Sequence, residues 1–257
     1  MNNGDHITSP AAKVKTSTPP VRIFFGFFGI ALIRKWIQAG SQAKFRIMEN
    51  VDQQLVNDFI EACHLAGRLG LVRCSSGNLS LRVGPDTALV TASRSWLQDL
   101  REDQIALCRI STGELLCGGP ASVESRFHLG ILHARREIAC VFHFQSPAAT
   151  TFACIPDVTD FNIVPEVPFY IGPIARVPFL LPGTAPLADA VVAAMRDHDL
   201  AILQNHGLVT VGTTLRHAIQ NAEFFELACD LMLRAGDRVV MLTPDAVRTL
   251  REPHAGA

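Results

Sequence analysis

Residues 122–146 read SVESRFHLGILHARREIACVFHFQS, and this stretch predicts a helix followed by a buried strand. Apolar side chains recur on one side of the helix at the spacing of its turns. They are Phe127, Leu129, Ile131 and Leu132. Residues 138–144 are apolar and rich in β-branched and aromatic types, as is typical of an interior strand. We expect the rest of the chain to be organised around this helix and strand.

Polar side chains stand at the start of this helix and at the end of this strand. Ser122 is expected to be the N-cap, with Glu124 in the first turn, where the helix dipole favours a negative charge. His143 and Gln145 close the strand and, being two residues apart, face the same side of it. A carboxylate beside neutral nitrogen and oxygen donors makes up the parts of a metal-assisted active site.

The composition limits the classes of protein to consider. The chain has 257 residues and a formal net charge of -1, which suits a single α/β domain with a large core. Its charges are mixed, so no basic block indicates nucleic acid, and a small-molecule substrate is the expected partner. The seven cysteines are an odd number without a Cys-x-x-Cys pair. They predict reduced thiols in a cytoplasmic protein rather than a disulfide framework.

Residues 1–47 differ in character from residues 48–257. We expect them to be a poorly ordered or wrongly assigned N-terminal extension, with Met48 as the natural start of the domain. The apolar run 23–33 has about eleven residues, whereas a spanning helix needs roughly 20. It resembles the apolar part of a signal peptide without a clear cleavage site, and an interfacial anchor stays open. No stable membrane insertion is expected.

Hydrophobic periodicity and turn residues divide the remaining chain into alternating elements. Helices are expected at 51–70, 146–154, 186–196 and 214–233, and strands at 78–83, 86–91, 175–179, 200–203 and 208–211, with two more short strands between 103 and 116. The proline-rich segment 157–174 carries no clear pattern. No internal repeat is visible.

Two turns add candidates for chemistry. His206 lies in the turn Gln204-Asn205-His206-Gly207 after a buried strand, and Gly77-Asn78 opens another strand. A histidine at a strand end is commonly structural, but with two of them and a glutamine beside one, a metal site and a structural role stay equal alternatives. The Gly77-Asn78 turn is a common turn whose functional alternative is a cradle of backbone N–H groups for an anion. His128 and His133 on the central helix are expected at the surface or against a partner.

The order of these motifs resembles the class II aldolase/adducin family, which includes fuculose-phosphate aldolases and ribulose-phosphate epimerases. The resemblance covers roughly residues 48–233. The matching motifs are Gly77-Asn78-Leu79-Ser80, Thr91-Ala92-Ser93, Ser122-Val123-Glu124, residues 141–146, Pro182-Gly183-Thr184 and Asn205-His206-Gly207-Leu208. Any one of them alone would not be specific.

This resemblance implies a three-layer αβα sandwich around a mostly antiparallel, mixed central sheet. It also implies a four-fold symmetric homotetramer with active sites between subunits, and a divalent ion that is zinc first, with manganese or iron as alternatives. His143 and His206 match metal ligands, and Glu124 matches the acid/base carboxylate that can also touch the metal. Gly77, Asn78, Ser93 and Ser122 match the positions that bind substrate phosphate.

Two departures from the family pattern bear on function. Gln145 stands where the family has its second metal-binding histidine, and zinc prefers imidazole to an amide oxygen. Arg94 occupies a glycine position and Val123 a serine position, so the anion site loses a hydroxyl and gains a guanidinium. A guanidinium suits a carboxylate held in a bidentate pair. The expected substrate is therefore a small hydroxy- or keto-acid rather than a sugar phosphate.

The resulting hypothesis is a metal-dependent lyase of the class II aldolase type. It would cleave a C–C bond of a small hydroxy-carbonyl compound, by retro-aldol reaction or decarboxylation, through an enediolate whose charge the ion stabilises. Glu124 is the expected catalytic residue, with His143, Gln145 and His206 as metal ligands and Arg94 added to the substrate-binding set. Two alternatives remain: a non-catalytic adducin-like interaction module with a degenerate metal site, and an epimerase.

Overall fold

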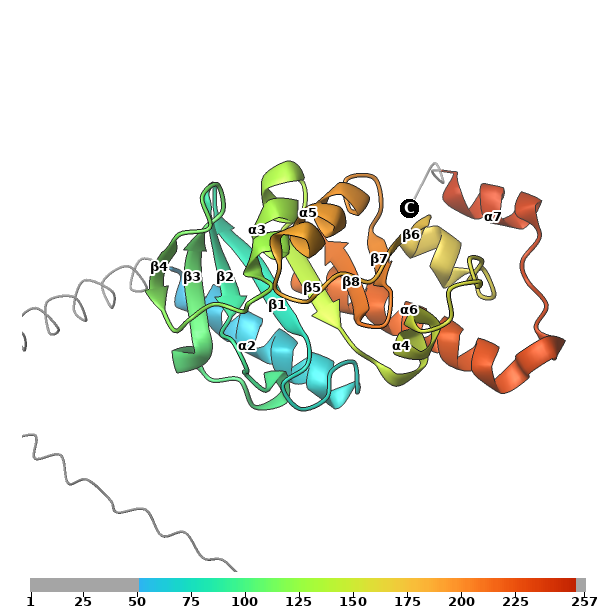
Figure 1. Cartoon of the computed structure of the whole chain (residues 1–257), viewed down its shortest axis with the longest axis horizontal. Helices are drawn as coiled ribbons and strands as arrows, with labels where there is room; N and C mark the ends of the chain where they lie inside the picture. The colour runs from blue at the N-terminus through green and yellow to red at the C-terminus, as the bar shows by residue number, and fades with distance from the viewer. Residues whose placement is uncertain (1–50, 253–257) are drawn as a thin grey trace, which may run out of the picture. The chain divides into compact units, whose positions relative to one another are not determined.

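A mixed eight-stranded sheet forms the centre of the protein (Figure 1). The computed structural model describes residues 51–252, so the expected N-terminal extension lies outside the described residues and its assignment stays a prediction. The strand order is β4-β3-β2-β1-β5-β8-β7-β6, and every neighbouring pair is antiparallel except β6 and β7. The strands are β1 (Asn78–Gly84), β2 (Thr87–Thr91), β3 (Ile105–Arg109), β4 (Leu115–Gly118), β5 (Cys140–Phe144), β6 (Ile174–Val177), β7 (Leu200–Leu203) and β8 (Gly207–Gly212).

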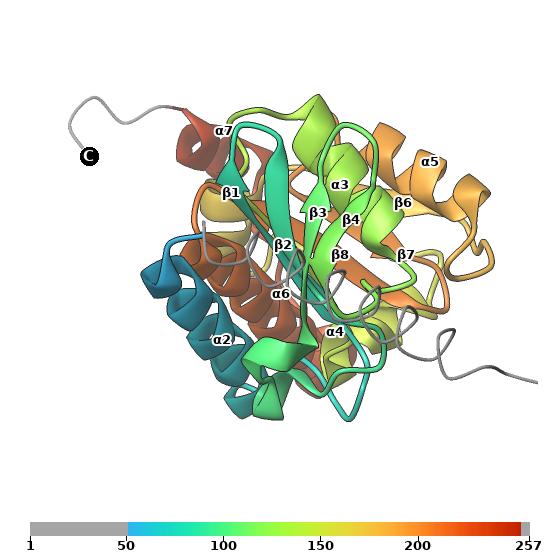
Figure 2. The same ribbon diagram turned by 90° about the vertical axis from the view of Figure 1, so that its left-hand side faces the viewer.

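Helices cover both faces of this sheet. α3 and α5 pack together on one face, while α2, α4 and α6 lie on the other (Figures 1 and 2). The helices are α2 (Gln53–Arg68), α3 (Ser125–Ala134), α4 (Pro147–Ala153), α5 (Ala185–Ala194), α6 (Leu215–Ala235) and α7 (Pro244–Arg251). The expected three-layer αβα sandwich around a mostly antiparallel sheet is confirmed. No helix within residues 51–252 combines the length and the apolar character needed to cross a bilayer.

The central strand β5 shows how the sequence builds the two layers. All five of its residues are buried, and successive side chains alternate between the two faces of the sheet. Phe142 and Phe144 join the hydrophobic cluster under α2 and α6, whereas Val141 joins the cluster under α3 and α5. His143 therefore faces the layer of α3 and α5, which places a polar side chain in an otherwise apolar strand.

The central helix begins later than the sequence predicts. Its first residue is Ser125 and its N-cap is Glu124, so the assignment of Ser122 as N-cap is wrong. The backbone N–H of Ser122 donates to the carbonyl of Thr91 at 3.0 Å, which keeps this residue paired with the neighbouring strand. The Ser122 hydroxyl instead accepts from the backbone N–H of Glu124 at 3.2 Å. The displaced start leaves the Glu124 side chain at the very tip of the helix.

A carboxylate from α6 holds the start of α4, the helix that directly follows β5. The Glu226 carboxylate accepts hydrogen bonds from the Ser146 hydroxyl at 2.6 Å and from the backbone N–H groups of Ala148 and Ala149 at 2.9 and 2.7 Å. These N–H groups belong to the first turn of the helix and have no partner inside it. The N-terminus of α4 is thus capped by Glu226, which is distant in sequence, and not by the side chain of its own N-cap residue Ser146.

Replacing Glu226 by glutamine is expected to lower the free energy of unfolding by about 2 kcal/mol, because charge-assisted bonds to the helix start are lost. Glu223 is the matched control, since it lies one turn away on the same helix. Burial, and then the charge of Glu226, raise the pKa of Glu223. Glu223→Gln removes a charge that the fold disfavours, so it should not lower the unfolding free energy. Urea denaturation measures both variants, and equal losses would contradict the capping role.

Candidate metal centre

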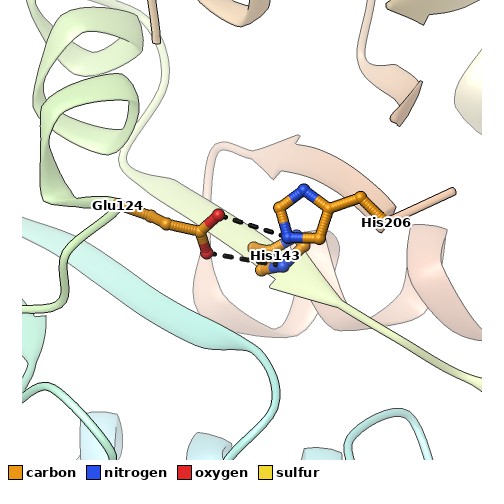
Figure 3. Close-up of side chains that lie close together, drawn as sticks. All are labelled: Glu124, His143 and His206. Carbon is orange, nitrogen blue, oxygen red and sulfur yellow. Dashed lines mark ion pairs between the residues drawn. The ribbon is translucent and has the colours of Figure 1, made fainter. Parts of the chain in front are cut away.

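Three side chains from distant parts of the chain converge on the α3 face of the sheet (Figure 3). Glu124 caps α3, His143 stands in β5, and His206 lies in the turn between β7 and β8. Nε2 of His143 is 3.5 Å from Oε2 of Glu124, and Nε2 of His206 is 3.3 Å from Oε1. The two imidazole rings lie 4.9 Å apart, centroid to centroid. One carboxylate therefore bridges two histidines.

The orientation of His143 is fixed from behind. Its Nδ1 lies 2.9 Å from the backbone carbonyl of Leu208, which can only accept a hydrogen bond. In a neutral ring the proton therefore stands on Nδ1, and the lone pair of Nε2 points at Glu124. A histidine held in this way by a carbonyl is the usual arrangement of a metal-ligating imidazole.

The buried polar atoms of the cluster fit a divalent cation. The three potential ligand atoms lie within 4.8 Å of one another. Oε1 of Glu124 and Nδ1 of His206 are buried and have no hydrogen-bond partner. Leaving a buried polar atom without a partner costs free energy, and a cation between the three side chains would offset that cost at Oε1. Two imidazole nitrogens and a carboxylate oxygen are ligands that zinc and neighbouring transition metals accept.

The charges of the cluster also suit a cation. Burial raises the pKa of Glu124, but His143, the hydrogen bond from Asn78 and His206 outweigh it, so the pKa lies below its ordinary value. Burial, and then His143, lower the pKa of His206 to about 4, although Glu124 acts in the opposite direction. Near neutral pH the site therefore presents a charged carboxylate and a neutral His206, as metal binding requires.

Gln145 supports the turn that carries His206. Its carboxamide nitrogen donates to the backbone carbonyl of His206 at 2.8 Å. Gly207 permits this contact, because a Cβ at that position would lie 2.7 Å from both Cγ of Gln145 and the carbonyl oxygen of Phe144. The ligand role expected of Gln145 stays a prediction, while Glu124 joins the two histidines in the cluster.

The residues expected to bind substrate lie in segments that adjoin this centre. Gly77 adopts φ +79°, and a Cβ there would come within 2.8 Å of the His143 carbonyl oxygen, so the turn needs glycine to pass β5. Ser93 donates through its backbone N–H to the carbonyl of Pro120 at 2.9 Å. Ser122 lies two residues after Pro120, and its hydroxyl accepts from the backbone N–H of Glu124. Their roles toward a substrate stay predictions.

Arg94 follows Ser93 in a left-handed conformation, with φ +64°. A residue with a side chain there costs roughly 1–2 kcal/mol relative to glycine. The guanidinium is exposed and makes no hydrogen bond or ion pair within residues 51–252. The chain therefore keeps a strained arginine whose charge is available to an anion.

Two further residues matter in ways the sequence did not indicate. The Asn78 side chain, expected to bind substrate, donates to Oε2 of Glu124 at 2.9 Å. His128 is fully buried and contacts Asn78, so its expected surface position is wrong, whereas His133 is exposed as expected. The sequence does indicate that the two side chains are neighbours, because Glu124 and His128 are four residues apart, which puts both on one face of a helix.

An αβα sandwich that gathers two imidazoles and a carboxylate from the start of a helix has the make-up of a metal-assisted enzyme. A sequence model described as "Class II Aldolase and Adducin N-terminal domain" matches residues 57–233. The chain belongs to this family.

Named relatives narrow the reaction class. The chain is 32% identical over 186 residues to the 3-oxo-tetronate 4-phosphate decarboxylase of Pectobacterium atrosepticum, covering 70% of this chain and 85% of that protein. It is 32% identical over 171 residues to the L-fuculose phosphate aldolase of Methanococcus maripaludis, covering 66% and 91%. The crystal structure of YgbL from Escherichia coli superposes with a TM-score of 0.74 at 27% identity, covering 78% and 99%. A decarboxylase and an aldolase are both lyases, so the expectation of a class II aldolase-type lyase is confirmed at the level of reaction class.

Proposed function

We propose that the protein is a metal-dependent lyase that removes the carboxylate of a small, phosphorylated 3-oxo acid. The convergence of Glu124, His143 and His206 carries this proposal, because it supplies a cation site and a proton carrier at one place. The similarity to 3-oxo-tetronate 4-phosphate decarboxylases supports the substrate class. Aldol cleavage of a sugar phosphate is the second candidate, supported by the similarity to L-fuculose phosphate aldolases.

His143 and His206 would hold the ion, and Glu124 would complete its ligands until the substrate takes that place. Zinc is proposed first, with manganese or iron as alternatives, since Gln145 replaces an imidazole. A bound divalent ion supplies Lewis acidity toward the substrate carbonyl oxygen. Leu208 keeps the His143 ring in its orientation, and Gln145 keeps the His206 turn in place. The chain's own contribution is therefore a rigid, largely water-excluded frame around the reacting carbonyl.

Glu124 would move the proton. In decarboxylation the bond between the carboxylate carbon and its neighbour breaks, CO2 leaves, and the electron pair stays on the substrate as an enediolate. The carbon that lost CO2 then takes a proton, which Glu124, charged near neutral pH, would first take up from solvent and then deliver through Oε1, the oxygen that no hydrogen bond occupies. The same oxygen would take a proton from the substrate hydroxyl in aldol cleavage.

Arg94 would bind an anionic group of the substrate. Its turn is fixed beside the segment leading to Glu124 by a bridge between Ala92 and Ala121 and by the Ser93–Pro120 hydrogen bond. The family resemblance implies a separate set of residues that would bind the phosphate, namely Gly77, Asn78, Ser93 and Ser122. Arg94 would then bind the carboxylate in a bidentate pair.

We also propose that the site is completed by a second copy of the chain in a homotetramer. Val123, next to Glu124, is 65% exposed, and Phe179 and Leu181 are 55% and 65% exposed. A Cβ on Gly183 would lie 3.5 Å from the Val123 side chain, so the loop carrying these residues adjoins Val123. Exposed apolar side chains on neighbouring segments are typical of a subunit interface.

A cytoplasmic location fits the thiols. None of the seven cysteines, all of which lie within residues 51–252, forms a disulfide, and five of them are buried. Reduced cysteines are typical of proteins in the cytoplasm.

The proposal is tested by assaying the full-length protein, loaded separately with zinc, manganese and iron, for CO2 release from phosphorylated 3-oxo acids. Parallel assays follow aldehyde formation from ketose phosphates and epimer formation from pentulose phosphates. CO2 release at the highest kcat/KM is expected. Aldehyde or epimer formation as the main activity would replace the proposal by the corresponding alternative. If the ion-loaded protein turned over none of these substrates, the proposal would be replaced by the non-catalytic, adducin-like interaction module.

Arg94→Gly separates function from stability. Removing the left-handed strain is expected to leave the melting temperature unchanged or higher, while kcat/KM for the preferred acid falls about 10- to 100-fold through loss of a charge-assisted pair. Arg94→Lys is the matched control, because it keeps the charge and the strain but loses the bidentate geometry. Its kcat/KM should lie between that of the original protein and that of Arg94→Gly. Unchanged kcat/KM in Arg94→Gly would contradict the assignment of Arg94 to the substrate.

A further inference from the structure

A chain of four buried polar side chains leads from the sheet to the Glu124 carboxylate. Its members are Ser80 and Asn78 on β1, His128 on α3 and Glu124 itself, and each is less than 9% exposed. The Ser80 hydroxyl lies 2.9 Å from Nδ1 of His128, and Nε2 of His128 is hydrogen bonded to Oδ1 of Asn78. Nδ2 of Asn78 then donates to Oε2 of Glu124 at 2.9 Å.

The direction of each hydrogen bond in this chain follows from the one beside it. A carboxylate can only accept, so the Asn78 amide must turn its NH2 group toward Glu124 and its oxygen toward His128. An amide oxygen can only accept as well, so Nε2 of His128 must carry a proton. In a neutral ring Nδ1 is then an acceptor, and the Ser80 hydroxyl is its donor.

The two carboxylate oxygens of Glu124 differ in their hydrogen bonds. Oε2 receives the Asn78 amide and faces His143, whereas Oε1 has no hydrogen bond and faces His206 at 3.3 Å (Figure 3). If the Asn78 amide turned over, its oxygen would face Oε2 and its NH2 group would face the Nε2 proton of His128. Both contacts would be repulsive, so His128 and the carboxylate together hold the Asn78 amide in one orientation.

We propose that His128 is a positioning residue for the lyase reaction: through Asn78 it fixes the rotation of the Glu124 carboxylate and leaves Oε1 as the oxygen that carries the proton. His128 touches neither the substrate nor the ion, so its effect is on the proton-transfer step. Fixing the Asn78 amide removes alternative carboxylate rotations that would cost catalytic efficiency. This inference rests on the proposed function, because it assigns a part in that reaction.

Two substitutions at His128 separate positioning from packing. His128→Gln can keep an N–H donor toward Asn78, whereas His128→Leu fills similar space without a donor. Loss of a supporting residue of this kind typically costs 10- to 100-fold in activity, so we expect His128→Leu to lower kcat about 30-fold with KM changed less than about threefold. We expect His128→Gln to recover kcat to within about fivefold of the original protein.

Thr210→Val is the control for disturbing a buried polar residue in the same sheet. Thr210 is fully buried on β8 and pairs in register with Phe142, so it faces the layer of α6. Its kcat should stay unchanged. Equal losses of kcat in His128→Leu and His128→Gln would overturn the inference, as would a rise in KM at constant kcat.

A second measurement does not need activity or a stable variant. Nitrogen-15 NMR of histidine side chains in the metal-free, full-length protein should show His128 protonated on Nε2 and unprotonated on Nδ1, with its signal assigned by its absence in His128→Gln. Protonation on Nδ1 would overturn the inference even in an active enzyme. Conversely, a protein without lyase activity but with the Nε2 tautomer would contradict the proposed function and leave the hydrogen-bond chain intact.

Discussion

Glu124→Gln is expected to lower kcat of the ion-saturated enzyme by about 10²- to 10⁴-fold, the usual contribution of a positioned proton carrier. Glutamine keeps the size of the side chain and the carbonyl oxygen that Asn78 contacts, but it cannot release or accept a proton. KM should change less than kcat, because Arg94, proposed to bind the substrate carboxylate, lies in another segment. Steady-state kinetics at saturating ion concentration measures the loss.

Glu137→Gln is the control for this variant. Glu137 lies just after α3 and forms an ion pair with Arg135 at 2.7 Å, with its side chain 61% exposed. A surface pair of this kind contributes little, so activity should be unchanged. If Glu124→Gln retained the original kcat, Glu124 would have no role as proton carrier.

The second large effect concerns the ion itself. His206→Gln is expected to weaken divalent-ion binding by at least about 100-fold, since one of two imidazole ligands is lost from a three-ligand site. At an ion concentration near 100 times the dissociation constant, binding stabilises the original protein by about 2.7 kcal/mol. For a domain of this size that corresponds to a rise in melting temperature of about 5–10 °C.

Elemental analysis and thermal unfolding with and without added zinc measure this prediction. The original protein should bind an ion and melt at a higher temperature with zinc. At the same zinc concentration His206→Gln should bind at most about half as much ion, and its melting temperature should rise by no more than about 2 °C. His133→Gln is the control, because His133 is exposed and lies outside the cluster. Undiminished ion content in His206→Gln would remove His206 from the metal centre.

Local patterns in the sequence predict most of the fold. The apolar spacing of residues 51–70 gives α2, and the run of residues 138–144 gives β5, because each pattern reflects burial on one or both faces of the element. The start of α3 could not be predicted in this way. Pairing of Ser122 with Thr91, about 30 residues earlier, delays the helix, and no local signal encodes that contact.

The segment 157–174 shows the same limit. It contains a short π-helix at Val167–Ile171, and Arg176 donates to the carbonyls of Val158 and Phe152 at 2.6 and 3.2 Å. A single guanidinium on β6 thus organises backbone that has no periodic pattern of its own. Long-range contacts of one side chain to main-chain groups leave no trace in hydropathy.

For the site, the sequence indicates residue types better than their partners. Their positions at element ends indicate Glu124, His143 and His206 as candidates, and the structure brings them together. The engagement of Asn78 with Glu124, and the burial of His128, depend on how β1 and α3 pack against each other. Helical spacing alone could show that Glu124 and His128 share a face, but not that this face is covered.

The three residues proposed to bind the cation are far apart in the sequence, and this has a consequence for biosynthesis. Glu124 and His143 leave the ribosome together, but His206 follows 63 residues after His143 (206 − 143 = 63). A nascent chain therefore exposes an incomplete donor set, and high-affinity metallation must wait until β8 has docked against β5. Tight binding of the ion would therefore require that β8 has been synthesised and has paired with β5. A truncated product that ends before β8 would bind metal ions weakly.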